Sequence, residues 1–261
     1  MKLTILAASG GIGRHLLDQA LAAGHEVTAV VRQPAKLADL TGSRAVQADR
    51  AVQTVPAGRT DRTRRPDPAS QPESRPESRL LRVVQADLAT ADAAALLPAV
   101  TGADAVLSAL GAVGKSGIGV AEHGTLAVLE AMRTAGIGRI LVVSAAPIGT
   151  VASPARPHPP RHDPGDGFLM RHLLSPAVKR VLRAHYADLA RMEDALRASD
   201  LEWTSVRPPQ LTDRPLTTTY RIALDQNLRG GSKISRASVA HYLLRALDDP
   251  STIGHAVGIA D

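Results

Sequence analysis

Three glycines, Gly10, Gly11 and Gly13, lie in the stretch LAASGGIGRHLL, after a short apolar run and before a run of helix-forming residues. A strand, a glycine-rich turn and a helix together form an anion site, because N–H groups at a helix N-terminus point outward and favour negative charge. We therefore expect the backbone from Ser9 through Ile12 to Gly13 to bind the pyrophosphate of a dinucleotide. The alternative is an ordinary tight turn.

Ala7 departs from the usual form of this motif. The spacing G-x-x-G-x-x-G would place a glycine at position 7, and the chain has alanine there. Alanine costs little at the end of a strand as long as its φ is negative. We expect that conformation at Ala7, and with it a functional turn.

The second apolar run indicates which nucleotide binds. NAD-specific proteins usually carry an acid about 20 residues after the turn, where it bonds the ribose 2′-hydroxyl. This chain has Arg32, 19 residues after Gly13, and no acid. A guanidinium suits a 2′-phosphate, so NADP(H) is favoured over NAD(H). Arg14 or Lys36 could share the role, and Arg32 could instead be a surface residue at a strand end.

Candidate cofactor contacts also follow the later apolar runs. Ligands of an open parallel sheet lie across the carboxyl ends of its strands. On this ground we expect Asp87 and Leu88 near the adenine, the segment 108–114 near the ribose and phosphates, and the segment 144–147 near the nicotinamide. The cofactor contacts that we expect in these segments and after the last apolar run are Asp87, Leu88, Ala109, Leu110, Gly111, Ser144 and Pro208.

The elements that must position these residues alternate along the chain. An apolar run at 3–7, a helical pattern at 11–23 and a second run at 27–31 form a β-α-β unit. The runs are continuous rather than alternating, which is typical of strands covered on both faces. We predict an α/β fold, a doubly wound parallel sheet (Rossmann fold), as one domain over 1–261. Further strands are expected at 82–86, 105–108, 140–144 and 203–207, and helices near 90–100, 120–135 and 176–198.

Two segments interrupt this alternation. Residues 56–79 hold five Pro, six Arg and four acids, and no Val, Ile, Leu or aromatic residue, so we predict a disordered segment. RAVQAD at 44–49 returns as RVVQAD at 82–87, which indicates an insertion over about 44–81 with the second copy as the third strand. The insertion is either a solvated loop or a basic arm for an acidic partner. The Pro-rich segment 147–167 is either a lid or a variable loop.

Composition excludes several classes of function. The chain has 261 residues, no Cys, 2% aromatic residues and a net charge of +6. Thiolate catalysis and disulfides are excluded, and a base-stacking surface for nucleic acid is not expected. His158, His162 and Asp163 could suggest a metal, but a Pro-rich loop is a poor scaffold for one and we predict none. No signal peptide or membrane span is evident, so we expect a cytoplasmic protein.

The C-terminal third carries a family resemblance. LARMEDALRASDLEWTSVRPPQLTDRPLTTTYRIALD and ISRASVAHYLLRAL, with the glycine turn, resemble the atypical short-chain dehydrogenase/reductases, the NAD(P)-binding group that includes NmrA-like proteins. The resemblance is greatest to flavin reductases of the biliverdin reductase B type. It implies hydride transfer from a reduced nicotinamide to a flavin or tetrapyrrole. Those enzymes have a His where this chain has Glu193.

Typical dehydrogenases of this superfamily use a Tyr with a Lys four residues later as the proton-transfer pair. Here Tyr186, Tyr220 and Tyr242 are followed at that spacing by Ala190, Leu224 and Ala246, so alcohol dehydrogenation is not expected. The catalytic candidates are Ser144, Tyr186 and Glu193, with Ser108 and Ser116 as competitors of Ser144. His185 and Tyr186 could donate a proton or stack on a ring, or simply pack.

These observations predict an NADPH-dependent reductase that passes hydride to a flavin, quinone or similar conjugated small molecule. The alternative is an NADP(H)-binding sensor or regulator without turnover. Neither the substrate nor the oligomeric state follows from the sequence.

Overall fold

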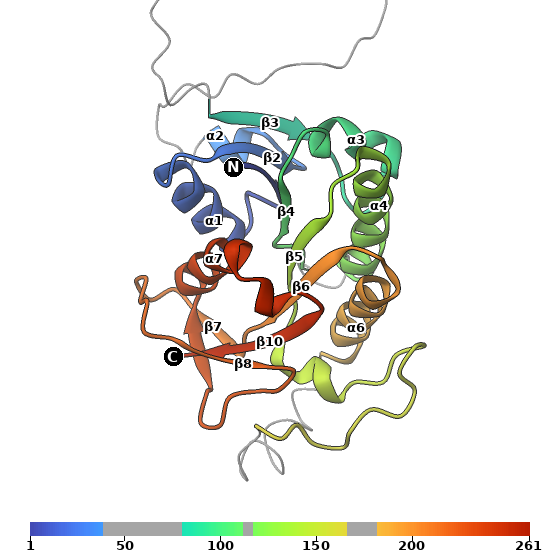
Figure 1. Cartoon of the computed structure of the whole chain (residues 1–261), viewed down its shortest axis with the longest axis vertical. Coiled ribbons are helices and arrows are strands. Elements are labelled where there is room, and N and C mark those ends of the chain that lie inside the picture. Colours follow the sequence, from blue (N-terminus) through green and yellow to red (C-terminus); the bar gives the residue numbers. More distant parts are fainter. Residues whose placement is uncertain (39–79, 112–116, 166–181) are drawn as a thin grey trace, which may run out of the picture.

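The computed structural model describes residues 1–38, 80–111, 117–165 and 182–261. Strands and helices alternate through the first two thirds of the chain, and short strands are more frequent in the last third (Figure 1). The elements are β1 (Lys2–Leu6), α1 (Gly11–Ala22), β2 (Glu26–Val31), α2 (Ala35–Ala38), β3 (Leu81–Gln85), α3 (Ala93–Val100), β4 (Ala105–Ser108), α4 (Val120–Ala135), β5 (Arg139–Val143), η3 (Ala146–Thr150), α6 (Arg183–Ala198), β6 (Glu202–Arg207), β7 (Gln210–Thr212), β8 (Arg221–Leu224), β9 (Lys233–Ser235), α7 (Arg236–Arg245), η5 (Ala246–Asp248), η6 (Pro250–Thr252) and β10 (His255–Ala260).

The main sheet has eight strands in the order β3-β2-β1-β4-β5-β6-β10-β8. Every neighbouring pair is parallel except β10 with β8, which is antiparallel. From β1 the chain continues through β2 to β3 on one side, and β4 then begins the other half of the sheet on the opposite side of β1. The place where the strand order reverses is the topological switch point, at which such sheets bind ligands. The predicted doubly wound fold is confirmed.

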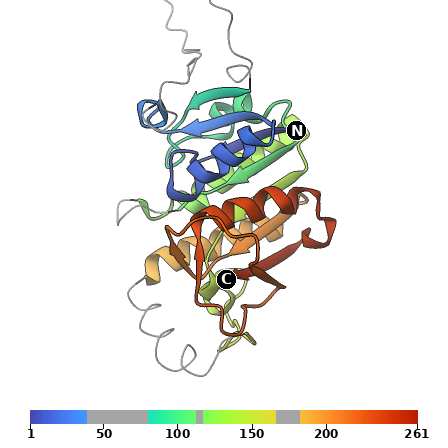
Figure 2. The same cartoon turned by 90° about the vertical axis from the view of Figure 1, so that its left-hand side faces the viewer.

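Helices cover both faces of this sheet. Helices α1 and α7 lie together on one face, where Leu16, Leu17 and Leu243 join the core, and both face the viewer in Figure 2. Helices α3, α4 and α6 cover the other face (Figure 1). Strands β4 and β5 are buried along their whole length. Burial on both faces of the sheet explains why the sequences of these two strands are continuously apolar.

The third strand is the second copy of the repeated hexapeptide, as predicted. Val83 in β3 pairs with Ala29 in β2, and the first copy at 44–49 lies outside the described residues. The insertion ends earlier than expected, because Leu81 already belongs to the sheet and pairs with Val27. The last large helix begins at Arg183, seven residues after the predicted start at 176, and residues 176–181 also lie outside the description.

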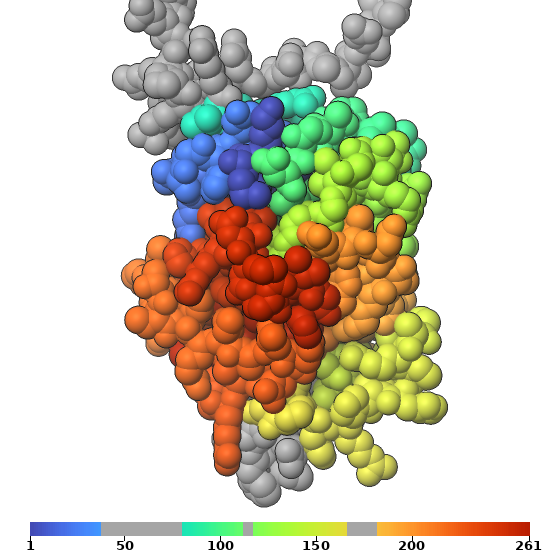
Figure 3. All heavy atoms as spheres, in the orientation of Figure 1, coloured from blue at the N-terminus to red at the C-terminus, as the bar shows by residue number. Residues whose placement is uncertain are grey.

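The C-terminal third contains elements that the sequence did not predict. Strands β7 and β9 form a separate two-stranded parallel sheet, and β10 extends the main sheet beyond β6. In Figure 3 the red C-terminal residues lie against the blue N-terminal ones. Helix α7 therefore lies beside α1, which carries the glycine turn.

Among the described residues, no helix is both long and apolar enough to cross a membrane.

Candidate functional site

The glycine turn leaves the start of α1 open to an anion. Gly10 is the N-cap residue in an extended conformation (φ −76°, ψ 173°), and no side chain caps the helix. The first helical hydrogen bond runs from the N–H of Arg14 to the carbonyl of Gly10, at 3.0 Å. Within the described part of the chain, the N–H groups of Gly11, Ile12 and Gly13 have no acceptor. The first turn of the helix also contains no acid, so nothing opposes a phosphate there.

Gly13 lets the helix pack against the strand that precedes the turn. A Cβ at this position would lie 2.2 Å from the carbonyl oxygen of Ala7 and 2.9 Å from the Cα of Ala8. No side chain fits in that space. In dinucleotide-binding turns, the last glycine allows the helix to pack this closely against the strand.

Ala7 corrects one expectation. Its φ is +56°, in the left-handed region, whereas we expected a negative value. The tight turn requires this conformation because the carbonyl of Ala7 must accept the N–H of Gly10, at 2.8 Å. A glycine would adopt it without strain, which explains why the motif usually has glycine here.

Parallel register brings the other candidates to the same edge of the sheet. Arg32, Asp87, Ala109, Ser144 and Pro208 follow strands β2, β3, β4, β5 and β6, at their carboxyl ends. The side chain of Arg32 is exposed and makes no ion pair with a described residue. Asp87 is also exposed, and its carboxylate accepts the N–H of Ala89 at 3.1 Å.

Several candidates can offer only backbone atoms to a cofactor. The side chains of Ile12, Leu88 and Leu110 are buried in the two core clusters. Leu88 and Leu110 pack against Gly124 of α4, where a Cβ would lie 3.1 Å from each of them. Gly111 is exposed, and residues 112–116, including the competing Ser116, lie outside the described residues.

Two buried serines lie at the carboxyl edge. Ser108 ends β4 and Ser144 directly follows β5, and neither hydroxyl has a hydrogen-bond partner among the described residues. Buried hydroxyls are normally paired, so each is available to a ligand. The two serines, the free amides of α1 and the close helix–strand packing at Gly13 together make this edge fit a dinucleotide.

Tyr186 and His185 lie at the start of α6. Tyr186 is 7% exposed and belongs to the core cluster beneath α4 and α6. Burial raises the pKa of the Tyr186 phenol and lowers the pKa of the half-buried His185. Both groups are therefore neutral at pH 7.

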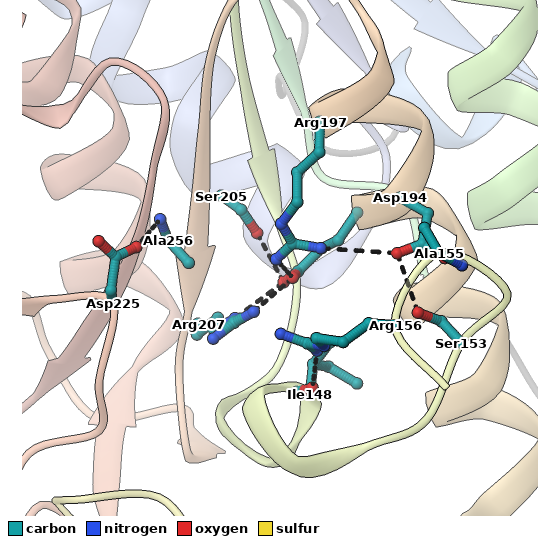
Figure 4. Close-up of polar contacts among 11 residues, drawn as sticks. Ile148, Ser153, Ala155, Arg156, Asp194, Arg197, Ser205, Arg207, Asp225 and Ala256 are labelled. Carbon is teal, nitrogen blue, oxygen red and sulfur yellow. Dashed lines mark hydrogen bonds and ion pairs between the residues drawn. The ribbon is translucent and has the colours of Figure 1, made fainter. Parts of the chain in front are cut away.

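Glu193 is completely buried and bound by two arginines. Oε1 of Glu193 accepts hydrogen bonds from Nε of Arg207 at 2.8 Å and from the hydroxyl of Ser205 at 3.0 Å. Oε2 accepts from Nη2 of Arg207 and from Arg197, the latter at 2.6 Å. Figure 4 shows the two guanidinium groups converging on this carboxylate. Ser144 lies near enough to contribute as well, although its hydroxyl does not have hydrogen-bond geometry.

The charge state of Glu193 follows from these contacts. Burial alone would raise the pKa of Glu193, but the hydrogen bonds and charge of Arg207 and the charge of Arg197 lower it to about 2. The side chain is 0% exposed. A role in direct contact with a substrate does not fit this burial, and an ionised carboxylate has no proton to donate at neutral pH. Glu193 is instead placed to hold Arg207 at the end of β6.

The Pro-rich segment is tied to the same network. Its first residues form η3, and Arg156 donates to the carbonyl of Ile148 at 2.8 Å. Ser153 and the N–H of Ala155 donate to Asp194 of α6, at 2.9 and 3.0 Å (Figure 4). At its other end, the buried Asp163 accepts the N–H of Asn227 at 2.7 Å. The described part of this segment, up to residue 165, is therefore attached at both ends.

No metal centre emerges in the part of the chain that the structure describes, where no three His, Asp or Glu side chains are grouped to bind an ion.

Three residues with contacts at or near this edge escaped the sequence reasoning: Arg207, Arg236 and Asp188. The sequence does show Arg207 as a charged residue at the end of an expected strand, directly before Pro208. Arg236 begins α7 and lies across Gly11, and its Cδ would be 2.9 Å from a Cβ there. Asp188, 0% exposed, accepts N–H groups at the start of α4. Nothing in the local sequence signals the last two contacts.

Comparison with known proteins agrees with this geometry. The NAD(P)H-binding family matches residues 7–57 and 62–250. A UPF0659 protein of Schizosaccharomyces pombe is 32% identical over 153 residues, which cover 57% of this chain and 58% of that protein. The chain thus matches little more than half the length of this curated relative.

Solved structures share the fold over the whole chain. One is described as a putative NADH-flavin reductase from Streptococcus pneumoniae, with a TM-score of 0.61 and 23% identity, covering 100% of this chain and 99% of its own. Another is an anaerobilin reductase from Escherichia coli O157:H7, with a TM-score of 0.66, 18% identity and coverage of 100% and 97%. A third is a short-chain dehydrogenase/reductase from Veillonella parvula in complex with NADP, with a TM-score of 0.66, 17% identity and coverage of 100% and 94%.

The family match spans most of the chain, and the matched region contains the glycine turn and the carboxyl ends of the five strands from β2 to β6. This chain belongs to the NAD(P)H-binding family.

Proposed function

We propose that the protein is an NADPH-dependent reductase whose acceptor is a flavin, quinone or similar conjugated small molecule. The observation that carries the proposal is the open start of α1, which has three unpartnered amides, together with the exposed Arg32 at the end of β2, the strand that pairs with β1. A bound reduced nicotinamide would supply hydride from its C4. The names of the similar solved structures, a putative flavin reductase and an anaerobilin reductase, are compatible with this class of acceptor.

The residues at the carboxyl edge favour an acceptor that needs no strong acid. Glu193 stays ionised, and the phenol of Tyr186 has a raised pKa and no lysine four residues later. We assign to Ser144 the role of donating a hydrogen bond to the nicotinamide amide or to the acceptor carbonyl. Tyr186 would pack beside the ring, and Glu193 would position Arg207. The reduced acceptor would take its proton from solvent.

The test is turnover on a panel of acceptors. Purified protein is mixed with NADPH and each of several flavins and quinones, and the absorbance of the reduced nicotinamide is followed. We expect consumption of NADPH with at least one acceptor. The Ser144→Ala variant should be slower with that acceptor. Absence of any heat of binding with NADPH and NADH would refute the proposal.

The cofactor preference has its own test in Arg32→Glu. The carboxylate would repel a 2′-phosphate and suit a 2′-hydroxyl, so NADPH should lose about tenfold or more in affinity while NADH changes little. Arg133→Gln, on the opposite face of the sheet, is the control and should change neither affinity. Equal loss for both nucleotides in Arg32→Glu would contradict the assignment.

A sensor without turnover is the second candidate. A sensor needs no proton donor, and the described edge of the sheet offers none: it holds no Tyr–Lys pair, and the ionised Glu193 cannot act as an acid. Tight binding of NADPH without consumption across the panel would support this function over the reductase.

A further inference from the structure

Arg236 lies directly over the glycine turn. A Cβ on Gly11 would be 2.9 Å from both Cδ and Nε of Arg236 and 3.9 Å from its Cζ. The φ of Gly11 is not in the left-handed region. A side chain at position 11 would therefore have to displace the arginine, whereas the backbone conformation there would accept one. The end of the Arg236 side chain lies against Gly11, the first residue of α1.

The small second sheet fixes this position. Strands β7 and β9 are parallel, and their last pair is Thr212 with Ser235. The next residues, Asp213 and Arg236, therefore leave the two strands side by side. Nη1 of Arg236 donates to Oδ1 of Asp213 at 2.7 Å.

Asp213 is a weak partner for this arginine. Its side chain is 86% exposed, whereas that of Arg236 is 30% exposed. Ion pairs with so exposed a member contribute little, because water and salt screen them. A phosphate accepts two parallel N–H bonds from a guanidinium and is the stronger partner. A phosphate would also accept hydrogen bonds from the free N–H groups of α1, to which Asp213 makes no hydrogen bond in this structure.

We propose that Arg236 binds the diphosphate of the cofactor together with the start of α1, and that Asp213 holds the guanidinium in place until the cofactor displaces it. The inference rests on the cofactor of the proposed function. The diphosphate is common to NADPH and NADH, whereas the 2′-phosphate is not. Arg236 therefore supports both nucleotides equally, which separates its role from that of Arg32.

Calorimetric titration with NADPH and with NADH tests this role. Arg236→Ala should weaken both nucleotides by a similar factor, about tenfold or more, and Arg236→Lys should fall between this variant and the wild type. Asp213→Asn removes the competing carboxylate and should bind both at least as tightly as the wild type. Arg133→Gln, an exposed ion-paired arginine on α4, is the control and should bind normally.

A double substitution locates the effect at the turn. In the wild-type background, Gly11→Ala should displace Arg236 and weaken both nucleotides. In the Arg236→Ala background it should add little, because the obstructed side chain is gone. Thermal melting shows whether each variant is folded.

The outcomes separate the two proposals. If the wild type binds both nucleotides and a folded Arg236→Ala binds them as well, the role of Arg236 is refuted alone. A loss confined to NADPH, or weaker binding by Asp213→Asn, also refutes it. If the wild type binds neither nucleotide, the proposed function and this inference fall together.

Discussion

Ala7 holds a backbone conformation that alanine rarely adopts. The left-handed region costs an L-residue about 1–2 kcal/mol, and among the described residues only Ala7 and Asp225 occupy it without being glycine. The turn keeps Ala7 there because its carbonyl must accept the N–H of Gly10. Strain of this kind is often retained at binding sites.

Ala7→Gly should therefore increase the free energy of unfolding. Relief of the strain exceeds the entropy that glycine adds to the unfolded chain, about 0.5–1 kcal/mol, so we expect a gain of about 0.5–1 kcal/mol in urea unfolding. Ala8→Gly is the matched control, because Ala8 is 0% exposed and has no positive φ. That variant should be destabilised. Similar destabilisation by both substitutions would show that Ala7 is not strained.

At the scale of elements, Asp188 joins α6 to α4. Gly119, the N-cap residue of α4, has no side chain to offer. The carboxylate of Asp188 instead accepts the N–H groups of Gly119 at 2.9 Å, Ala121 at 3.3 Å and Glu122 at 3.0 Å. One helix is thus capped by the next, and the cap also benefits from the helix dipole.

Asp188→Ala should cost more than an ordinary helix cap. It leaves three N–H groups without an acceptor in a buried place, so we expect a loss of about 2–4 kcal/mol in urea unfolding. Asp92→Ala is the control, because Asp92 caps α3 through one exposed bond to Ala95 at 2.9 Å and should lose about 1 kcal/mol. Equal losses would mean that Asp188 does not act as a shared cap.

The elements themselves were largely predictable from the sequence. The strands β1, β2, β4 and β5 are short, mostly apolar runs, and the helices between them have one apolar stripe, so local periodicity identified both. The glycine turn and the strand ends were found because parallel topology places them at one edge. Side-chain partners were not predictable in this way. Asp188 with Gly119, Glu193 with Arg207 and Arg236 with Gly11 depend on how separate elements pack, and local patterns carry no such information.

At the scale of the whole molecule, a buried arginine stabilises each end of the sheet, but the two differ in their partners. Arg207, at the carboxyl end of β6, binds the carboxylate of Glu193. Arg139, at the amino end of β5, is 7% exposed and donates to neutral oxygens, including Thr204 at 2.8 Å and the carbonyl of Ala246 at 2.9 Å. Burial lowers the pKa of Arg139. The hydrogen-bond acceptors of Arg139 are all neutral, and the carboxylates of Glu202 and Asp249 act on it only through their charge.

The stability of the fold should therefore decrease in acid through Glu193. The pKa of Glu193 is about 2 in the folded protein, against 4.5 for a free side chain. A lowered pKa stabilises the fold above pH 4.5, and that stabilisation is lost as the pH falls from about 4.5 to about 2. The contribution is on the order of 3 kcal/mol. Urea unfolding between pH 7 and pH 2.5 measures it.

Two variants assign this dependence to the Glu193–Arg207 pair. Glu193→Gln should be destabilised at pH 7 by about 3–5 kcal/mol, because it leaves a buried guanidinium unpaired, and it should lose less stability than the wild type on acidification. Arg139→Met should also be destabilised at pH 7 but should keep most of the acid dependence of the wild type, since its hydrogen-bond partners do not titrate and its charge acts on Glu202 and Asp249 without a hydrogen bond. If Glu193→Gln instead declined with acid as steeply as the wild type, another carboxylate would have to be responsible, and Glu193 would not control the acid stability of the carboxyl edge.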